Sequence, residues 1–301
     1  MKQQHTICNF LNEESWVILS PIEQSIKQKI ETVGTPLKDW DINIYRGVLT
    51  GYNDAFIIST EKRDEILANC QTEEERVRTE ELIRPILRGR DIKRYGYDWA
   101  DLWLIATFPS RHYDIEMYPS VKKYLLSFGI ERLEQTGKTH VINGEKIKAR
   151  KKTSNKWFET QDSISYWEDF NKPKIVYPNM TKFLPFVYDD KQHLTNQKCF
   201  IIKGKHVAFL TAFFNSSLFK FCFRDSFPEL LGGTRELSKI FFDKIPVIQI
   251  DEKTEKEFLN LVIDIQENYT KEKAIHIDEL LFDLYNLTKE EKDVIGYIEI
   301  K

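Results

Sequence analysis

The chain has 301 residues, of which 41% are hydrophobic and 30% are charged, a composition that fits a folded globular protein of one large domain or two modest ones. Its apolar stretches are too short to span a bilayer, and residues 1–15 lack the apolar region of a secretory signal. The four cysteines are widely spaced and include no C-x-x-C pair, so we expect a cytoplasmic protein with no membrane association and no disulfide scaffold.

The net charge of −3 is distributed unevenly along the chain. Residues 1–83 carry 9 basic and 15 acidic side chains, residues 84–156 carry 16 and 8, residues 157–250 carry 12 and 10, and residues 251–301 carry 7 and 14. The segment 84–156 therefore has a net charge of +8 between two acidic ends. Such a local field attracts polyanions, although a charge run on its own more often forms a solvated surface.

The spacing of apolar residues predicts strands and helices in alternation, followed by a helical end. The expected strands cover residues 15–20, 41–48, 55–59, 102–107, 174–177, 183–188, 198–203 and 205–208. The expected helices cover residues 22–32, 72–83, 119–133, 209–224, 251–268 and 277–286, with a short one after Thr288. The fold class is therefore α+β, with a mixed-sheet domain over residues 1–247 and a helical extension over residues 248–301.

Three local motifs support this assignment. Thr72-Glu-Glu-Glu75 and Thr288-Lys-Glu-Glu291 have the spacing of capping boxes, which begin helices. Within residues 137–156, the Asn143-Gly144 pair favours a tight turn and predicts a hairpin or an exposed loop.

The motifs of several enzyme classes are missing. The chain contains no Pro-Pro pair, and hence no Asn/Asp-Pro-Pro-aromatic motif of a DNA methyltransferase, and it has no P-loop, H-E-x-x-H or G-x-S-x-G motif. Asp251-Glu-Lys253 and Glu290-Glu-Lys292 match the acid-x-Lys pattern of metal-dependent nucleases, but pairs this short arise by chance in a charged chain. We expect no catalytic residue, metal or cofactor here, with a cryptic Mg²⁺-dependent nuclease or a degenerate methyltransferase as the alternative.

A series of short phrases resembles one protein family in order and spacing. The phrases are Trp16-Val-Ile-Leu-Ser20, Gly34-Thr-Pro-Leu-Lys-Asp-Trp40, Ile44-Tyr-Arg-Gly-Val-Leu-Thr-Gly-Tyr-Asn-Asp-Ala-Phe-Ile-Ile58, Ile83-Arg-Pro-Ile-Leu-Arg-Gly-Arg-Asp-Ile-Lys-Arg-Tyr95, Lys172-Pro-Lys-Ile-Val-Tyr-Pro178, Phe214-Asn-Ser-Ser-Leu218, Gly232-Gly233 and Asp278-Glu-Leu-Leu-Phe-Asp-Leu-Tyr-Asn-Leu-Thr288. Together they resemble the TaqI-like C-terminal specificity domain, or target-recognition domain, of type IIG restriction–modification enzymes and adenine-specific DNA methyltransferases. The specificity subunits of type I systems are relatives of this family.

The resemblance implies a module that binds double-stranded DNA and selects the site for an adenine-N6 methyltransferase or restriction enzyme. This chain would be the C-terminal part of such an enzyme or a free-standing specificity subunit. Its partners would be a methyltransferase domain, and often a nuclease domain, while S-adenosylmethionine and any Mg²⁺ would belong to the parent enzyme. A protein-interaction module that uses the amphipathic C-terminal helices is a further alternative.

The candidate DNA contacts follow from side-chain chemistry, because the base-reading residues of such domains vary with the target. Lysine and arginine suit phosphates, whereas arginine and asparagine suit base edges. The first set is the basic run Lys146, Lys148, Arg150, Lys151, Lys152 and Lys156. The second set is Arg88, Arg90, Lys93 and Arg94, and the structural alternative is that one or two of these arginines pair with Asp91 or Asp98.

Two further candidates lie beside glycines, Asn53 in the Thr50-Gly-Tyr-Asn53 turn and Arg235 after Gly232-Gly233. A purely structural turn is the alternative for each of them. Our hypothesis is that the basic segment 84–156 lines one wall of a cleft for duplex DNA, while the acidic tail 251–301 faces away.

Overall fold

The computed structural model describes residues 19–182 and 185–298, which form two compact units that are discontinuous in sequence. Unit 1 comprises the described parts of Met1–Ile42, Thr181–Phe186 and Gly204–Lys301, and unit 2 comprises Asn43–Met180 and Val187–Lys203. The contacts thus divide the chain differently from the predicted domains, 1–247 and 248–301. Whether residues 1–247 recognise DNA by themselves stays a prediction.

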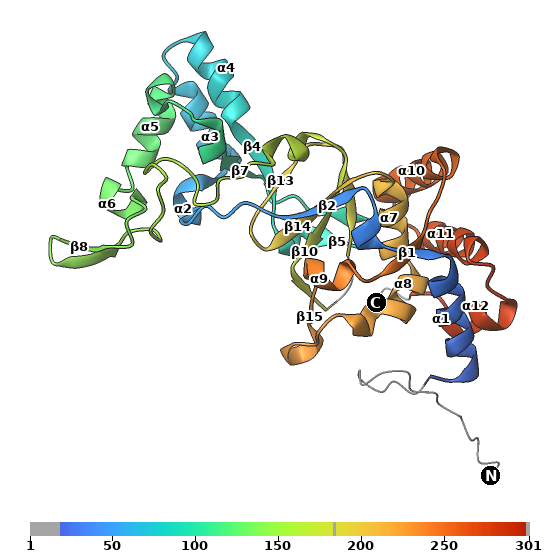
Figure 1. The fold of residues 1–301 in the computed structure, drawn as a ribbon. Helices are drawn as coiled ribbons and strands as arrows, with labels where there is room; N and C mark the ends of the chain where they lie inside the picture. Colours follow the sequence, from blue (N-terminus) through green and yellow to red (C-terminus); the bar gives the residue numbers. More distant parts are fainter. Residues whose placement is uncertain (1–18, 183–184, 299–301) are drawn as a thin grey trace. The chain divides into compact units, whose positions relative to one another are not determined.

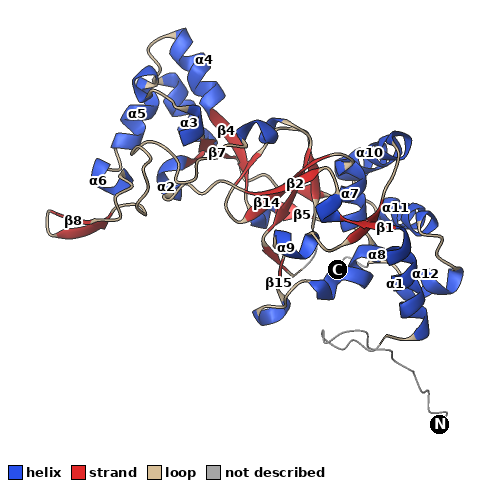
Figure 2. Cartoon of the chain, in the orientation of Figure 1, coloured by secondary structure: helices blue, strands red, loops and turns tan. Residues whose placement is uncertain are grey.

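Unit 2 is built on two four-stranded sheets, and its strands and helices are drawn in Figures 1 and 2. The first sheet has the order β12-β10-β14-β2, with β10 antiparallel to β12 and β14. The second has the order β13-β4-β7-β3, in which β7 is antiparallel to β4 and β3, and β13 is parallel to β4. The strands are β2 (Ile42–Arg46), β3 (Ile57–Ser59), β4 (Ile83–Leu87), β5 (Ile92–Lys93), β6 (Gly96–Tyr97), β7 (Leu102–Ile105), β8 (Thr139–Ile142), β9 (Glu145–Lys148), β10 (Lys174–Pro178), β12 (Val187–Asp189), β13 (Leu194–Thr195) and β14 (Cys199–Gly204), while β11 (Met180–Thr181) falls where the chain passes between the units.

Besides its strands, unit 2 contains short helices and a hydrophobic core. Phe56, Leu104, Phe170, Val176 and Ile201 are fully buried members of this core. Burial of each such side chain stabilises the unit by about 1.5–3 kcal/mol. The helices are α2 (Asn53–Phe56), α3 (Thr60–Ala68), α4 (Glu73–Leu82), α5 (Pro119–Leu126) and α6 (Ile130–Leu133), with 3-10 turns η2 (Gly89–Asp91), η3 (Pro109–Arg111), η4 (Ile115–Met117) and η5 (Trp167–Asn171).

Unit 1 is mainly helical and packs around phenylalanine side chains. Phe209, Phe213, Phe214, Phe219 and Phe242 are each at most 1% exposed, and their rings contact one another, several of them edge to face. Its elements are α1 (Pro21–Val33), β1 (Gly34–Pro36), η1 (Leu37–Asp39), α7 (Val207–Phe214), α8 (Ser217–Phe223), η6 (Arg224–Ser226), η7 (Leu231–Gly233), β15 (Arg235–Glu236), α9 (Lys239–Phe242), β16 (Pro246–Ile248), α10 (Glu252–Glu267), α11 (Lys271–Leu284) and α12 (Lys289–Ile295).

The acidic C-terminal helices are tied to the rest of unit 1 by their carboxylates. The Glu255 carboxylate on α10 accepts hydrogen bonds from the backbone amides of Ala208 (3.0 Å) and Phe209 (2.9 Å) at the start of α7. Asp278 on α11 accepts from the amide (2.8 Å) and the hydroxyl (2.5 Å) of Ser217 at the start of α8. These bonds satisfy amides that a helix leaves unpaired at its start, so the acidic tail is an integral part of unit 1.

Most predicted elements are present, and the main differences occur where helices begin or end. The predicted helix 119–133 is split into α5 and α6, because Gly129 has a left-handed φ of 82°. The predicted helix 209–224 is split into α7 and α8, since the Ser216 hydroxyl accepts from the Phe219 amide and begins a new helix. The predicted strand 205–208 is wrong, because these residues form a turn and the start of α7.

One of the two predicted capping boxes is complete. At α12 the Thr288 hydroxyl accepts from the Glu291 amide, and the Glu291 carboxylate accepts from the Thr288 amide at 2.7 Å. At α4 the Thr72 hydroxyl caps the helix, but the Glu75 carboxylate accepts from the amides of Gln71 and Ser120 instead. The predicted strand 15–20 and part of strand 183–188 fall outside the described residues. No helix in the described part of the chain has the length and apolar composition needed to cross a membrane.

Candidate nucleic-acid interface

The basic run lies in unit 2 on the hairpin of β8 and β9 and on the loop that follows it (Figure 1). The two strands are antiparallel, and the hairpin predicted from the Asn-Gly pair is confirmed. Asn143 and Gly144 have φ values of 51° and 85°, as a two-residue turn of this kind requires. Lys146 and Lys148 are two residues apart on β9, so their side chains project from one face of the hairpin.

Arg150, immediately after the hairpin, is buried at 4% exposure. Its guanidinium donates hydrogen bonds to four backbone carbonyls, those of Leu133 (2.8 Å), Thr50 (2.8 Å), Glu159 (2.7 Å) and Trp157 (2.6 Å). Burial lowers the pKa of Arg150 to about 10, so the group is still charged near neutral pH. Arg150 holds separate segments together and cannot reach a phosphate, which corrects its prediction as a DNA contact.

Two amide side chains hold the loop after the hairpin in one conformation. The Gln135 amide nitrogen donates to the carbonyl of Lys156 (3.1 Å), and its oxygen accepts from the Thr153 hydroxyl (2.8 Å). The Asn155 amide nitrogen donates to the carbonyl of Gln161 (2.9 Å). The loop therefore has internal partners for its backbone, and its lysine side chains project from a fixed base.

The remaining members of the basic run form what we call the lysine surface, which consists of Lys146, Lys148, Lys151, Lys152 and Lys156. All five are exposed, and none is within 4.0 Å of a carboxylate oxygen among residues 19–182 and 185–298. Like charges this close along the chain repel one another, and a polyanion that lies across them relieves the repulsion. The lysine surface has the chemistry of a phosphate-binding surface.

Arg150 also fixes the position of the turn that carries Asn53. The Thr50 carbonyl accepts from the Arg150 guanidinium, and the Thr50 hydroxyl donates to the Asn53 side-chain oxygen at 2.7 Å. Asn53 is exposed at the start of α2, and its amide nitrogen has no acceptor within the described part of the chain. The structure therefore connects Asn53 to the base of the lysine surface through one buried side chain.

Gly51 is required at the turn between these residues. Its φ is 78°, and a Cβ added there would lie 2.6 Å from the Gln161 side-chain oxygen and 3.0 Å from Cδ of Arg150. We expect Gly51→Ala to lower the free energy of unfolding by about 1–2 kcal/mol, because a residue with a Cβ is strained in this conformation. Urea denaturation measures this, with Gly96→Ala as the control, since a Cβ there meets nothing within 4 Å. Equal effects of the two substitutions on the free energy of unfolding would show that a Cβ at position 51 is not strained.

In the second predicted set, two members are ion-paired, and the pairing of Arg88 with Asp91 is the one that the structural alternative proposed. The Arg88 guanidinium makes a two-pronged contact with the Asp91 carboxylate, with Nη2 to Oδ1 at 2.8 Å and Nε to Oδ2 at 3.0 Å. The bonds to Asp91 raise the pKa of Arg88. Lys93 pairs with Asp98 while its side chain stays 60% exposed. Arg88 therefore stabilises the turn of η2. Lys93 and its partner Asp98 are both exposed, so the Lys93 ammonium group is accessible to a phosphate.

The other two members of this set differ in environment. Arg90 is exposed and forms no ion pair with any described residue. Arg94 is half-buried, with its guanidinium carbon 5.4 Å from the centre of the Tyr95 ring. Of the two, Arg90 is the freer to contact a base or phosphate.

Arg235 lies in unit 1 and is 8% exposed. Its guanidinium donates to the carbonyl of Phe227 (2.8 Å) and to the carboxylates of Asp225 (2.9 Å) and Glu229 (2.8 Å). These bonds close the loop that contains Gly232 and Gly233. Arg235 is therefore a structural residue, which corrects its prediction as a DNA contact.

One residue of each acid-x-Lys pair has a structural partner. Asp251 caps α10 by accepting from the Thr254 amide at 2.8 Å. Lys292 binds the carboxylates of Glu279 and Asp283, each at 2.8 Å. Within residues 19–182 and 185–298, no group of three or more His, Cys, Asp or Glu side chains is arranged to hold a metal ion.

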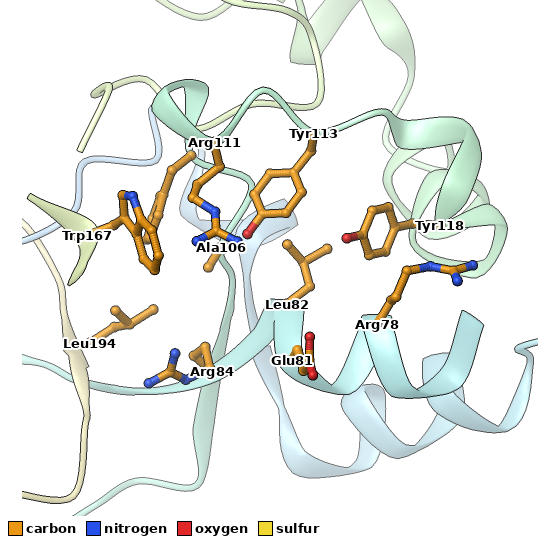
Figure 3. Close-up of a pocket in the computed structure, with 11 residues that line it drawn as sticks. Arg78, Glu81, Leu82, Arg84, Ala106, Arg111, Tyr113, Tyr118, Trp167 and Leu194 are labelled. Atoms are coloured by element: carbon orange, nitrogen blue, oxygen red, sulfur yellow. The ribbon is translucent and has the colours of Figure 1, made fainter. Parts of the chain in front are cut away.

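Sequence reasoning missed one feature of unit 2, a pocket of about 270 Å³ lined by three arginines, Arg78, Arg84 and Arg111 (Figure 3). Tyr113 and Trp167 also line it. These residues come from α4, β4, the loop around η3, and η5, so no local pattern in the sequence brings them together.

Comparison with known proteins identifies the family. A family model described as the TaqI-like C-terminal specificity domain matches residues 84–247, more than half of the chain. The chain belongs to this family. The matched residues include the lysine surface and most of the arginine-lined pocket. No curated protein matches the chain.

Two solved structures share the fold of this specificity domain. The type IIG restriction endonuclease BpuSI matches 89% of the chain with a TM-score of 0.52 and 12% identity, and the type IIL restriction–modification enzyme MmeI, solved in complex with DNA, matches 84% with a TM-score of 0.52 and 12% identity. The chain covers 34% of each of these structures, about a third of their length. The predicted α+β fold is thereby confirmed.

Proposed function

We propose that this specificity domain binds double-stranded DNA and selects the sequence on which a restriction–modification enzyme acts. The observation that carries the proposal is the lysine surface, because it presents five exposed, unpaired ammonium groups on an internally braced hairpin and loop. The surface lies inside the segment that matches the specificity family. Contacts from these lysines to phosphates would supply affinity and orientation without reading sequence.

Sequence selection requires side chains that reach base edges. Asn53 and Arg90 are exposed, and the asparagine amide and arginine guanidinium match the hydrogen-bonding edges of adenine and guanine respectively. Enrichment of bound duplexes from a random pool tests the selection directly. A single enriched motif is expected, and Asn53→Ala should relax it at one position. A pool with no enriched motif would contradict selection by this domain.

We infer that the chemical step belongs to another domain of the parent enzyme. The proposed reaction is adenine-N6 methylation with S-adenosylmethionine, accompanied in some parents by Mg²⁺-dependent cleavage, on an adenine extruded from the duplex. What supports this division is that the family is a specificity module and that the chain covers a third of its structural neighbours. The free cysteines Cys70, Cys199 and Cys222 are compatible with the proposed cytoplasmic location.

The double substitution Lys151→Ala with Lys152→Ala tests the phosphate contacts. We expect weaker binding to every DNA sequence and a salt dependence, log K against log salt, that is flatter by about 0.9 for each lost contact. Fluorescence anisotropy with one duplex over a series of salt concentrations measures this slope. Lys253→Ala with Lys256→Ala makes the same change in net charge on exposed positions of α10 and is the control. An unchanged slope for the first pair would remove the loop from the interface.

A further inference from the structure

The pocket in unit 2 is bounded by cationic, aromatic and apolar groups. Arg84 comes from β4 and Arg78 from α4, while Arg111 and Tyr113 come from η3 and the residues that follow it. Figure 3 shows the Arg111 guanidinium and the Tyr113 and Tyr118 rings along one side and Arg84 on the other, with Leu82 between them. The volume of about 270 Å³ lies just below the usual range of small-molecule sites, which limits the ligand to about the size of one nucleotide.

The lining of this pocket contains three arginines and one carboxylate, that of Glu81. None of the three arginines forms an ion pair within 4.0 Å among the described residues. Arg84 instead donates to the Asn171 side-chain oxygen at 3.1 Å and to the Gln192 carbonyl at 3.0 Å. Burial lowers the pKa of Arg84, and the charges of Tyr113 and Asp189 offset this effect only in part. An anion in the pocket would place a counter-charge directly against these guanidinium groups.

The aromatic side chains orient and extend this cationic site. The Arg111 guanidinium carbon lies 3.7 Å from the centre of the Trp167 ring, so the indole holds the guanidinium plane in place. Burial raises the pKa of Tyr113 and of Tyr118, which keeps both hydroxyls protonated and able to donate a hydrogen bond. Aromatic surface beside arginines is the combination that holds a base and a phosphate together.

We propose that this pocket binds a single nucleotide, with its phosphate at Arg84 and Arg111 and its base against the aromatic wall. The nucleotide could be free in solution or could be part of bound DNA, and the chemistry that recognises it is the same. The proposal is independent of the lysine surface, because a free nucleotide tests it in the absence of DNA.

Calorimetric titration of the full chain with deoxyadenosine 5′-monophosphate, deoxyadenosine and inorganic phosphate tests the site. We expect the monophosphate to bind at least about tenfold more tightly than either of the other two, because only it engages both the cationic and the aromatic groups. Arg111→Gln should lower its affinity about tenfold, the effect of one lost charged hydrogen bond. Lys123→Ala, at an exposed position of α5, should leave the affinity unchanged.

Thermal melts establish that each variant is folded, and Arg84→Gln gives a second test should Arg111→Gln unfold. Displacement of the monophosphate by saturating duplex DNA would identify the ligand as a nucleotide of bound DNA. Its retention beside bound duplex would identify a free nucleotide. The proposal is overturned if the monophosphate does not bind the wild-type chain, if deoxyadenosine binds equally well, or if the folded arginine variants retain full affinity. Failure of the chain to bind duplex DNA would contradict the proposed function and leave the nucleotide titration decisive for this site.

Discussion

Replacement of all five residues of the lysine surface by glutamine should remove most of the affinity for DNA. Each phosphate contact contributes a slope of about 0.9 to log K against log salt, because binding releases condensed counterions. Five lost contacts would flatten the slope by roughly 4–5 and lower affinity at 0.1 M salt by roughly 10³–10⁴-fold. Because all five side chains are exposed and unpaired, the free energy of unfolding should change little.

The same five substitutions separate phosphate contacts from base recognition. Residual binding by the variant at low salt should keep the sequence preference of the wild-type chain, since phosphate contacts carry no sequence information. Anisotropy titrations with a selected duplex and a scrambled duplex measure both quantities. A variant that keeps the wild-type salt slope would show that DNA lies elsewhere on the molecule. A variant that loses its preference while keeping most of its affinity would make these lysines base-reading residues.

Local features of the sequence were sufficient to predict the hairpin that carries part of the lysine surface and some of the core residues. The Asn143-Gly144 pair predicted the hairpin, because few residues other than asparagine and glycine adopt left-handed φ values in succession. The helical spacing of the phenylalanines predicted that Phe213 and Phe214 are core residues, and both are buried. Such predictions succeed because each depends on residues that are close in the chain.

Whether an individual basic side chain is buried or exposed depends on contacts with segments that are distant in the sequence. Lys146, Lys148 and Arg150 are spaced for one face of an extended strand, yet the strand ends at Lys148 and Arg150 turns inward. Its carbonyl partners include Thr50, a hundred residues earlier, and no local pattern indicates such a contact. The arginine-lined pocket was missed for the same reason, since its lining is assembled from four separate segments.

Replacement of Arg150 by methionine should destabilise the chain by about 3–5 kcal/mol. The substitution leaves the carbonyls of Leu133, Thr50 and Trp157 without the donor that now satisfies them, and a buried unsatisfied carbonyl costs about 1–3 kcal/mol. Methionine keeps much of the apolar volume of the arginine stem, so the loss reports the hydrogen bonds rather than a cavity. Urea or thermal denaturation followed by circular dichroism measures the change.

Lys151→Met is the matched control, because it removes one positive charge from the neighbouring, exposed position. We expect Lys151→Met to change the free energy of unfolding by less than about 0.5 kcal/mol and to weaken DNA binding modestly, with a slope flatter by about 0.9. Arg150→Met should instead lower the free energy of unfolding strongly. Its affinity for DNA should fall only to the extent that the loop loses its fixed conformation. If Arg150→Met were as stable as the wild-type chain and bound DNA with a flatter salt slope, Arg150 would be a phosphate contact and its assignment as a structural residue would be wrong.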